Sequence, residues 1–297
     1  MNKFLKKAVS SLLALGIAFS AVPCINSISE ASAEPNSDYN YGEALQKSMF
    51  FYQVQQSGPI ADWNEVSWRA DCMTNDYIPG GWFDAYSAAI LGWGILEYGD
   101  GVEKCGEMDE YKRNLAWALD YVEACDLGDE VVYMIGEGSF DHVWWGSAEV
   151  YMNKYELMTG ETERPYYTTK NSCVTGQMAA ALAVGYLVFK DSDPAKAKSY
   201  LEHAENCFKI ADTNRAIGDD EAEKPYYNCS SFYDDLFYAA NWLYRATGEQ
   251  KYLDLCKTDY IPNLDKENQS TELKFTWGFC WDDAQQANSP LCHEYRR

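Results

Sequence analysis

Hydrophobic residues recur along most of the chain at the spacing of amphipathic helices. Tyr111, Leu115, Leu119 and Val122 form one such stripe, because residues three and four apart share one face of a helix. Strand-like alternation is scarce, and residues 131–135 are the best short candidate. The pattern predicts an all-α fold, with helices at residues 41–57, 86–98, 108–125, 175–190, 194–212, 231–247 and 249–258.

Turn-forming residues separate these helices. They stand at 99–101, 191–194 and 247–248, where Pro194 suits a first helical turn and Asp193 can cap it. Three long loops remain, at residues 58–85, 126–174 and 213–230. Loops of that length in a compact domain usually carry function. Helical pairs with such loops on one rim predict a toroid of helical hairpins with a binding cleft across one end.

The N-terminal stretch has the pattern of a secretory signal peptide. Three lysines precede an apolar run at residues 8–22, and the small residues 31–33 follow as a cleavage site. We therefore expect residues 1–33 to be removed and the mature protein to be secreted into the extracellular space.

Charge and aromatic content narrow the range of partners. The chain holds 46 acidic and 24 basic residues, a formal net charge of −22, and such a surface repels nucleic acid and anionic lipid. No segment after the signal peptide offers about 18 uninterrupted apolar residues, so we expect no membrane-spanning helix. Aromatic residues make up 15% of the chain, which favours a sugar partner slightly, although core packing explains most of them. The oligomeric state stays open.

The cysteines give no recognisable framework. Ten are present, and Cys24 lies in the predicted signal peptide, which leaves nine in the mature chain. The absence of a CxxC pair argues against zinc or redox chemistry. We interpret most cysteines as small buried apolar residues and predict no disulfide pattern.

Several blocks, in order along the chain, resemble glycoside hydrolase family 9, the inverting endo-β-1,4-glucanases. They read "NYGEALQKSMFFYQVQQSG" at 40–58, "GGWFDA" at 80–85, "DHVWWGSAEV" at 141–150, "SSFYDDLFYAANWLYRATGE" at 230–249 and "WGFCWDD" at 277–283. The resemblance implies an (α/α)6 barrel, of which residues 34–283 are expected to form only the N-terminal part. It also implies hydrolysis of internal β-1,4 bonds in cellulose and related glucans with inversion.

Inversion needs two carboxyl groups about 6.5–9.5 Å apart, one acting as acid and one activating a water. In the family a DAGD motif supplies the base as its second aspartate, and its first aspartate helps to hold the water. Asp84 matches the first, and the chain then passes from Ala85 to Tyr86 without the base. In the family a glutamate acts as the acid, and the region that carries it has no match in this chain either. Judged without the resemblance, Asp84 is equally a helix cap.

The resemblance also assigns substrate contacts. His142 and Trp145 match a histidine that donates to a sugar hydroxyl and a tryptophan that stacks on a ring. Tyr226 matches a tyrosine beside the cleaved bond, and Trp277 matches a platform further along the cleft. Cys229 stands where some members carry a stacking tryptophan. We expect impaired activity, and the alternative is a non-catalytic carbohydrate-binding remnant of a glucanase.

A calcium site is implied in the same way, and no organic cofactor is expected. The matching ligands are Ser230, Ser231, Asp234, Asp235 and Asp282, whose hard oxygen atoms suit calcium. From spacing alone, Asp234 and Asp235 merely favour a helix N-terminus through its dipole.

The sequence changes character after Asp283. Residues 284–297 have no apolar periodicity and end on two arginines in an acidic protein. We hypothesise that this irregular tail is an aberrant end of the kind that a frameshift leaves.

Overall fold

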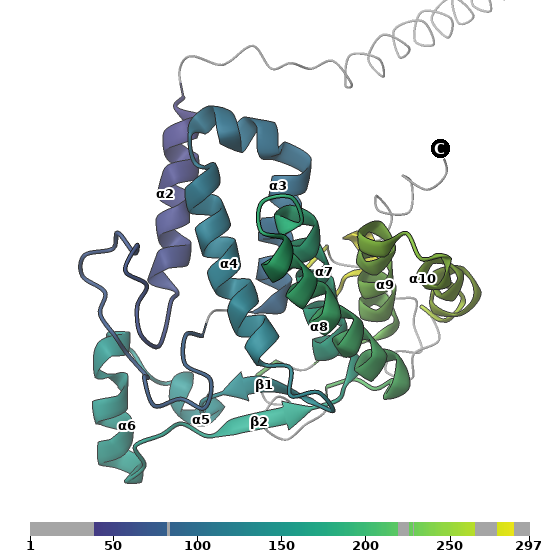
Figure 1. Cartoon of the computed structure of the whole chain (residues 1–297). Helices are drawn as coiled ribbons and strands as arrows, with labels where there is room; N and C mark the ends of the chain where they lie inside the picture. Colours follow the sequence, from purple (N-terminus) through teal and green to yellow (C-terminus); the bar gives the residue numbers. More distant parts are fainter. Residues whose placement is uncertain (1–38, 82–83, 219–225, 228, 265–277, 288–297) are drawn as a thin grey trace, which may run out of the picture. The chain divides into compact units, whose positions relative to one another are not determined.

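The computed structural model describes residues 39–81, 84–218, 226–227, 229–264 and 278–287. The chain divides into two units, residues 1–41 and 42–297. The second unit holds all the described elements except the first residue of α2. Its α-helices are α2 (Tyr41–Val54), α3 (Ala85–Cys105), α4 (Met108–Ala124), α5 (Gly138–Asp141), α6 (Tyr151–Thr159), α7 (Ser172–Phe189), α8 (Pro194–Thr213), α9 (Tyr233–Thr247), α10 (Gln250–Leu255) and α11 (Ile261–Asn263) (Figure 1).

Two further helical turns and two short strands complete these elements. The 3-10 turn η1 (Ala148–Val150) precedes α6, and the π-helical turn η2 (Cys256–Tyr260) joins α10 to α11. The strands are β1 (Val131–Ile135) and β2 (Tyr166–Thr169). Each predicted helix is present, so the predicted all-α character is confirmed for the described residues.

Some helix boundaries lie where the caps and turn-forming residues predicted them, and others do not. Asp193 caps α8, where its Oδ1 accepts a hydrogen bond from the backbone N–H of Lys196 at 3.1 Å, and Pro194 opens the helix as predicted. The predicted helix end at residue 98 is confirmed as a kink, but residues 99–101, predicted as a turn, are helical and α3 continues to Cys105. The helix kinks at Tyr98, whose φ of −125° and ψ of 16° are not helical.

Helix α7 forms the centre of the packing and contacts α3, α4, α8 and α9 (Figure 1). Small residues let the neighbouring helices approach closely. A Cβ atom at Gly92 of α3 would lie 2.4 Å from Val184 Cγ1, and one at Gly185 would lie 2.5 Å from Leu119 Cδ1. By length and composition α7 alone among the described helices could cross a membrane, but 78% of it is buried inside the protein. It is therefore a core helix.

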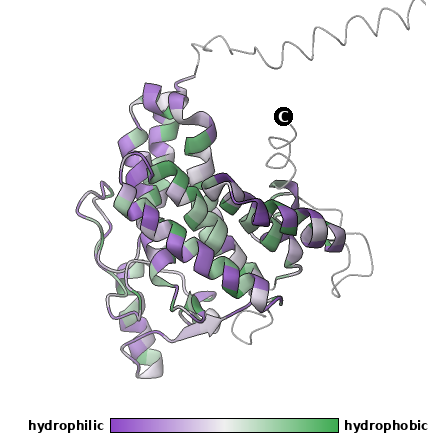
Figure 2. Ribbon diagram, turned by 45° about the vertical axis from the view of Figure 1, so that its right-hand side comes forward, coloured by the Kyte–Doolittle hydropathy of each residue, from purple (hydrophilic) through white to green (hydrophobic). Residues whose placement is uncertain are grey.

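Helices α4 and α8 bury one face each, whereas residues 234–243 of α9 are buried on all sides. Most of the helices carry both apolar and polar positions (Figure 2). The predicted stripe on α4 is confirmed, since Tyr111, Leu115, Leu119 and Val122 are all buried. Burial of such side chains is the main favourable contribution to folding.

The predicted loop 126–174 contains more regular structure than the one strand that its sequence indicated. The predicted strand at 131–135 is confirmed as β1, and it pairs antiparallel with β2, from Val131 opposite Thr169 to Ile135 opposite Tyr166. Between the two strands lie α5, η1 and α6. Phe140 packs there with Tyr151 and Tyr155 in a small separate core.

The first residues after Asp283 pack against the rest of the protein. Ala284 and Ala287 are buried in the main core, and residues 285–287 are helical. The backbone N–H of Ala284 donates to Asp234 Oδ2 at 2.8 Å. The remaining residues of the tail, 288–297, lie outside the described residues.

Candidate active site

A cavity of about 520 Å³ lies where the long loops meet the helices. Its wall is formed by residues from the segment 55–85, from α4, β1, α5 and α7, and from the segments around Arg164, Tyr227 and Trp281. These contributors are far apart in the sequence. The predicted cleft is therefore built largely by the loops that the sequence marked as functional.

Asp84 lies in the wall of this cavity and also caps α3. Its Oδ1 accepts a hydrogen bond from the backbone N–H of Ser87 at 2.6 Å. Burial raises the pKa of the Asp84 carboxyl, and hydrogen bonds from the backbone and hydroxyl of Ser87 act in the opposite direction. The sequence left two roles for Asp84 as alternatives, helix cap and site residue. In the structure Asp84 caps α3 and also lines the cavity.

The connection from Asp84 to α3 leaves no room for a second aspartate of the loop. Helix α3 begins at Ala85, directly after Asp84. Where the sequence departs from the family motif, Asp84 in the cavity wall is therefore joined directly to the helix.

Two other carboxylates line the cavity, and both have partners within the protein. Asp76 forms a two-point ion pair with Arg164, whose Nε and Nη2 lie 3.0 and 2.5 Å from the two carboxylate oxygens. Asp141 accepts a hydrogen bond from the Tyr151 hydroxyl. Burial raises the pKa of Asp141, while the hydrogen bond from Tyr151 and the positive charge of Arg164 act to lower it.

Sequence reasoning missed this network of Asp76, Asp141, Tyr151 and Arg164. It joins the loop before α3 to α5, to α6 and to the residues before β2, so it holds three walls of the cavity together. Asp141 stands beside His142 in a quoted block, but no spacing rule pairs it with a tyrosine and an arginine further along the chain.

His142 faces the same cavity as Asp84. Its Nδ1 lies 2.9 Å from the carbonyl oxygen of Gly138. A carbonyl can only accept, so Nδ1 carries a hydrogen and Nε2 is left as the acceptor of the neutral ring. Tyr226 stacks on the imidazole, with ring centroids 4.1 Å apart and planes 20° from parallel. The structure therefore brings three of the predicted residues together: Asp84, His142 and Tyr226.

The other predicted contacts lie apart from this group. Trp145 is 96% exposed and does not line the cavity, and Trp277 lies outside the described residues. Tyr227 and Trp281 line the wall instead, with ring centroids 6.0 Å apart. Trp281 belongs to the quoted block "WGFCWDD", so its aromatic character was the signal that could have found it.

Hydrogen bonds join the predicted calcium ligands in two pairs, Ser230 with Asp282 and Ser231 with Asp234. The Asp282 carboxylate accepts hydrogen bonds from the backbone N–H and the hydroxyl of Ser230, each at 2.6 Å. Asp234 Oδ1 accepts from the Ser231 hydroxyl at 2.7 Å, and Asp235 is fully buried beside them. Asp282 thus reaches the start of α9 from a distant segment, as the resemblance implied. A donor set of carboxylate and hydroxyl oxygens fits a hard cation.

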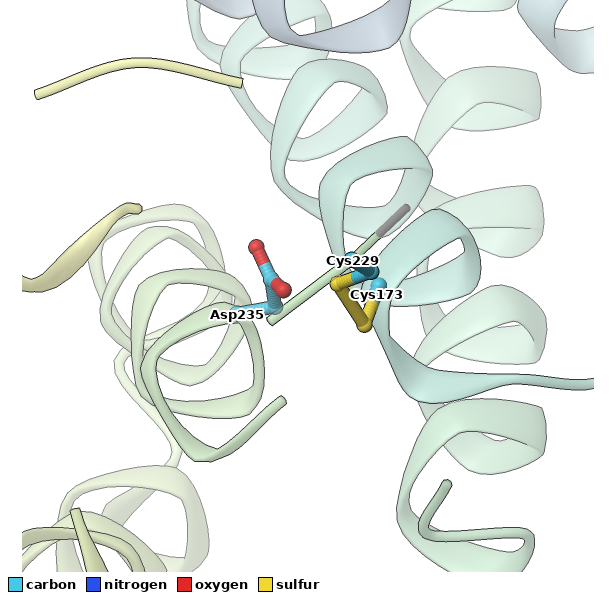
Figure 3. Close-up of side chains that lie close together, drawn as sticks. All are labelled: Cys173, Cys229 and Asp235. Carbon is cyan, nitrogen blue, oxygen red and sulfur yellow. A yellow bond between two sulfur atoms is a disulfide. The ribbon is translucent and has the colours of Figure 1, made fainter. Parts of the chain in front are cut away.

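The sequence left the pairing of the cysteines open, and the structure joins two of them. Cys173, at the start of α7, is bonded to Cys229 across a sequence separation of 56 residues (Figure 3). Their distance along the chain hid the pair, because connectivity cannot be read from cysteine positions alone. Cys72, Cys125 and Cys207 are buried thiols, as predicted for most cysteines.

Comparisons with known proteins agree with the fold and with the quoted blocks. The family described as glycosyl hydrolase family 9 matches residues 41–296. The chain is 40% identical over 280 residues to endoglucanase B of Cellulomonas fimi, covering 86% of this chain and 26% of that protein. It is 35% identical over 294 residues to endoglucanase A of Bacillus pumilus, covering 90% and 42% respectively.

Solved structures of similar proteins show the same architecture. Endoglucanase CelQ from Clostridium thermocellum, complexed with cellotriose, matches with a TM-score of 0.76 and 45% identity, over 86% of this chain and 43% of that one. An endoglucanase from the termite Nasutitermes takasagoensis matches with a TM-score of 0.76 and 28% identity, over 86% and 61% respectively. These matches confirm the expected (α/α)6 barrel of helical hairpins, of which this chain spans a part.

The family match covers most of the chain, and it extends past Asp283, where the quoted blocks end. The chain spans 26% and 42% of the lengths of the two curated relatives. On the family match and these identities, the chain belongs to glycosyl hydrolase family 9.

Proposed function

We propose that this chain hydrolyses internal β-1,4-glucosidic bonds in cellulose and related β-glucans, with inversion of configuration. One observation carries the proposal: Asp84 and His142, which match family site residues, face a single cavity that aromatic side chains also line. The endoglucanase names of the relatives and the cellotriose bound to the similar CelQ structure support a β-1,4-glucan as substrate.

In this proposal Asp84 holds and orients the attacking water. Its carboxylate faces the cavity while one oxygen is fixed by the Ser87 N–H, so the cap keeps the side chain in one orientation. A positioned carboxylate of this kind contributes by placing the water and by accepting hydrogen bonds from it.

His142 acts as a hydrogen-bond acceptor for a sugar hydroxyl while its ring is neutral. Gly138 occupies Nδ1, so only Nε2 can contact the sugar. The resemblance implied a donor at this position, and the ring can donate there only when it is protonated at both nitrogens. Tyr226 supports the ring by stacking, and Trp145 and Trp277 are proposed as stacking faces for further sugar units.

We propose that activity is low in this chain, because the segment that joins Asp84 to α3 has no second aspartate to match the principal base of the family. The direct junction of Asp84 to Ala85 supports this view. The second candidate function is a carbohydrate-binding role without catalysis. It is favoured by the same junction, since Asp84 as a plain helix cap accounts for its hydrogen bond to Ser87.

Calcium is proposed as a structural ion held by Ser230, Ser231, Asp234, Asp235 and Asp282. When bound, it would fix the start of α9 to the segment around Asp282 and balance the buried acidic charge. We also propose that the protein is secreted, with residues 1–33 as its signal peptide.

Measuring the reducing ends released from soluble carboxymethylcellulose tests the proposal. Release by the purified chain that disappears in Asp84→Asn supports hydrolysis. Binding of cellotetraose without release of reducing ends supports the carbohydrate-binding alternative. A chain that neither binds nor cleaves contradicts both.

A further inference from the structure

Tyr77 and Tyr166 form a stacked pair on the surface, outside the cavity of the candidate active site. Their ring centroids are 4.0 Å apart and their planes are 10° from parallel. Tyr77 belongs to the loop that precedes α3, and Tyr166 is the first residue of β2. Neither ring lines the cavity. The pair therefore joins two segments that are distant in sequence and presents its rings elsewhere on the protein.

The two rings keep much of their contact with solvent. Tyr77 is 52% exposed and Tyr166 is 44% exposed. Tyr151 and Tyr155 are also stacked, with planes 14° from parallel, but each of them is only 3% exposed. Burial is what makes such packing stabilising. The buried pair thus serves as core, whereas the exposed pair leaves flat apolar ring area open to a ligand.

An ion pair and a hydrogen bond hold the two segments together beside the tyrosines. Asp76, which precedes Tyr77, binds Arg164 at two points, and the side chains of this ion pair are 4% and 11% exposed. Asn75 Nδ2 donates to the carbonyl oxygen of Thr162 at 3.4 Å. The segments are therefore joined without the tyrosines. Because the backbone beside both rings is fixed, a ligand that stacks on them orders little of the protein, which lowers the entropic cost of binding.

The chemistry of this surface suits a neutral sugar polymer. A tyrosine offers an apolar ring face together with a hydroxyl that stays in water, and a pyranose ring likewise has an apolar face with hydroxyls at its edge. The formal net charge of −22 disfavours polyanions. Asp76 and Arg164 also line the cavity, so the tyrosine pair stands beside residues of the cavity wall along both segments.

We propose that Tyr77 and Tyr166 form a second glucan-binding site, which holds a β-1,4-glucan chain of insoluble cellulose outside the cavity. The inner ring faces cover each other, so the sugar stacks on an outer face of the pair. The proposal rests on the β-glucan proposed above as substrate, and it adds a site that binds the polymer without taking part in cleavage. Holding the protein on the solid in this way raises the effective concentration of glucan at the cavity.

Depletion of the full chain from solution by microcrystalline cellulose tests the proposal. Tyr77→Ala and Tyr166→Ala each remove one ring, and Tyr77→Leu keeps apolar packing on Tyr166 without a flat ring. Tyr77→Phe keeps the ring face. The control Tyr98→Ala removes a tyrosine that is 75% exposed at the kink of α3. Circular dichroism checks that each variant is folded, and cleavage of soluble cellotetraose is measured on the same preparations.

The expected result is weaker binding to cellulose with unchanged cleavage of the soluble substrate. Tyr77→Ala, Tyr77→Leu and Tyr166→Ala should bind cellulose about 3- to 10-fold more weakly than the parent, as loss of a stacking ring implies. Tyr77→Phe and Tyr98→Ala should bind as the parent does. High salt should leave the binding unchanged, because the ligand carries no charge.

Three results overturn the proposal. They are a parent chain that cellulose does not retain, folded alanine and leucine variants that bind as the parent does, and a parent dimer in analytical ultracentrifugation that Tyr77→Ala dissociates. In the last case the tyrosine pair binds a second copy of the chain. Retention on cellulose that depends on the tyrosines, without any cleavage of cellotetraose, would support the second site and contradict the proposed hydrolysis.

Discussion

Replacing Asp84 with asparagine and with alanine separates its two roles, the cap of α3 and the cavity-facing carboxylate. Asparagine offers the same acceptor to the Ser87 N–H, which lies 2.6 Å from Asp84 Oδ1, and is as good an N-cap as aspartate. Alanine offers none. The two variants therefore differ in the cap and agree in lacking the carboxylate.

The expected stabilities follow from this difference. Loss of an N-cap acceptor lowers the free energy of unfolding by about 1 kcal/mol, which is about 2–4 °C in melting temperature for a domain of this size. Asp84→Ala should show that loss. Asp84→Asn loses the attraction between the carboxylate and the helix dipole, which is about 0.3–1 kcal/mol. This loss is offset because the variant no longer buries a charge. Its melting temperature should stay within about 2 °C of the parent's.

The two variants are expected to differ in stability but to lose the same activity. If Asp84 places the water, both variants lose about 10²- to 10⁴-fold in the release of reducing ends from carboxymethylcellulose. Thermal unfolding by circular dichroism and the reducing-end assay are run on the same preparations. Equal destabilisation of both variants would contradict the cap, and parental activity in Asp84→Asn would contradict the role of the carboxylate.

Three further predictions concern stability. Gly185→Ala should lower the free energy of unfolding by about 1–3 kcal/mol in urea denaturation, because its Cβ would meet a leucine methyl group at 2.5 Å. The control Gly101→Ala, whose Cβ meets nothing within 4 Å, should instead stabilise α3 by about 0.5–1 kcal/mol. Calcium at about 100 times its Kd should raise the parent's melting temperature by roughly 5–10 °C; Asp282→Asn should lose this rise and the exposed control Asp129→Asn should keep it. At Glu149 burial acts to raise the pKa, but hydrogen bonds from a serine, an arginine and two backbone N–H groups hold it at about 2, below the ordinary 4.5. The stability that this carboxylate contributes is present above pH 4.5 and is lost as the pH falls toward 2. Glu149→Gln should lower the free energy of unfolding by about 1.5–3 kcal/mol at pH 7, and its free energy of unfolding should fall less than the parent's between pH 4.5 and 2.

Periodicity predicted helices such as α4 because their burial is one-sided. The stripe on α4 and the cap at Asp193 are local signals, and the structure has both. The glycines at residues 99–101 mark a kink at Tyr98, but the chain resumes helical geometry after it, because glycine lowers helix propensity without excluding a helix. Strand β2 is four residues long, and such a segment carries too little alternation to identify it.

The residues of the candidate site also fall into two groups. Local sequence signals identified one group, and only the tertiary structure brings the other together. Asp84 and His142 could be assigned because they lie in blocks that resemble a known family. The pairing of Asp76 with Arg164, the hydrogen bond from Tyr151 to Asp141 and the Cys173–Cys229 bond join residues that are not neighbours in sequence. Only the folded chain brings these groups together, so no motif or spacing could predict them.

Proton NMR of cellotetraose during incubation with the chain tests the central proposal most directly, because it reports both cleavage and the anomer that forms first. We expect slow cleavage in which the α-anomer of the new reducing end appears before mutarotation, as inversion at a β-linkage requires. Initial formation of the β-anomer would contradict inversion. Bound but intact cellotetraose would contradict hydrolysis and leave the carbohydrate-binding function.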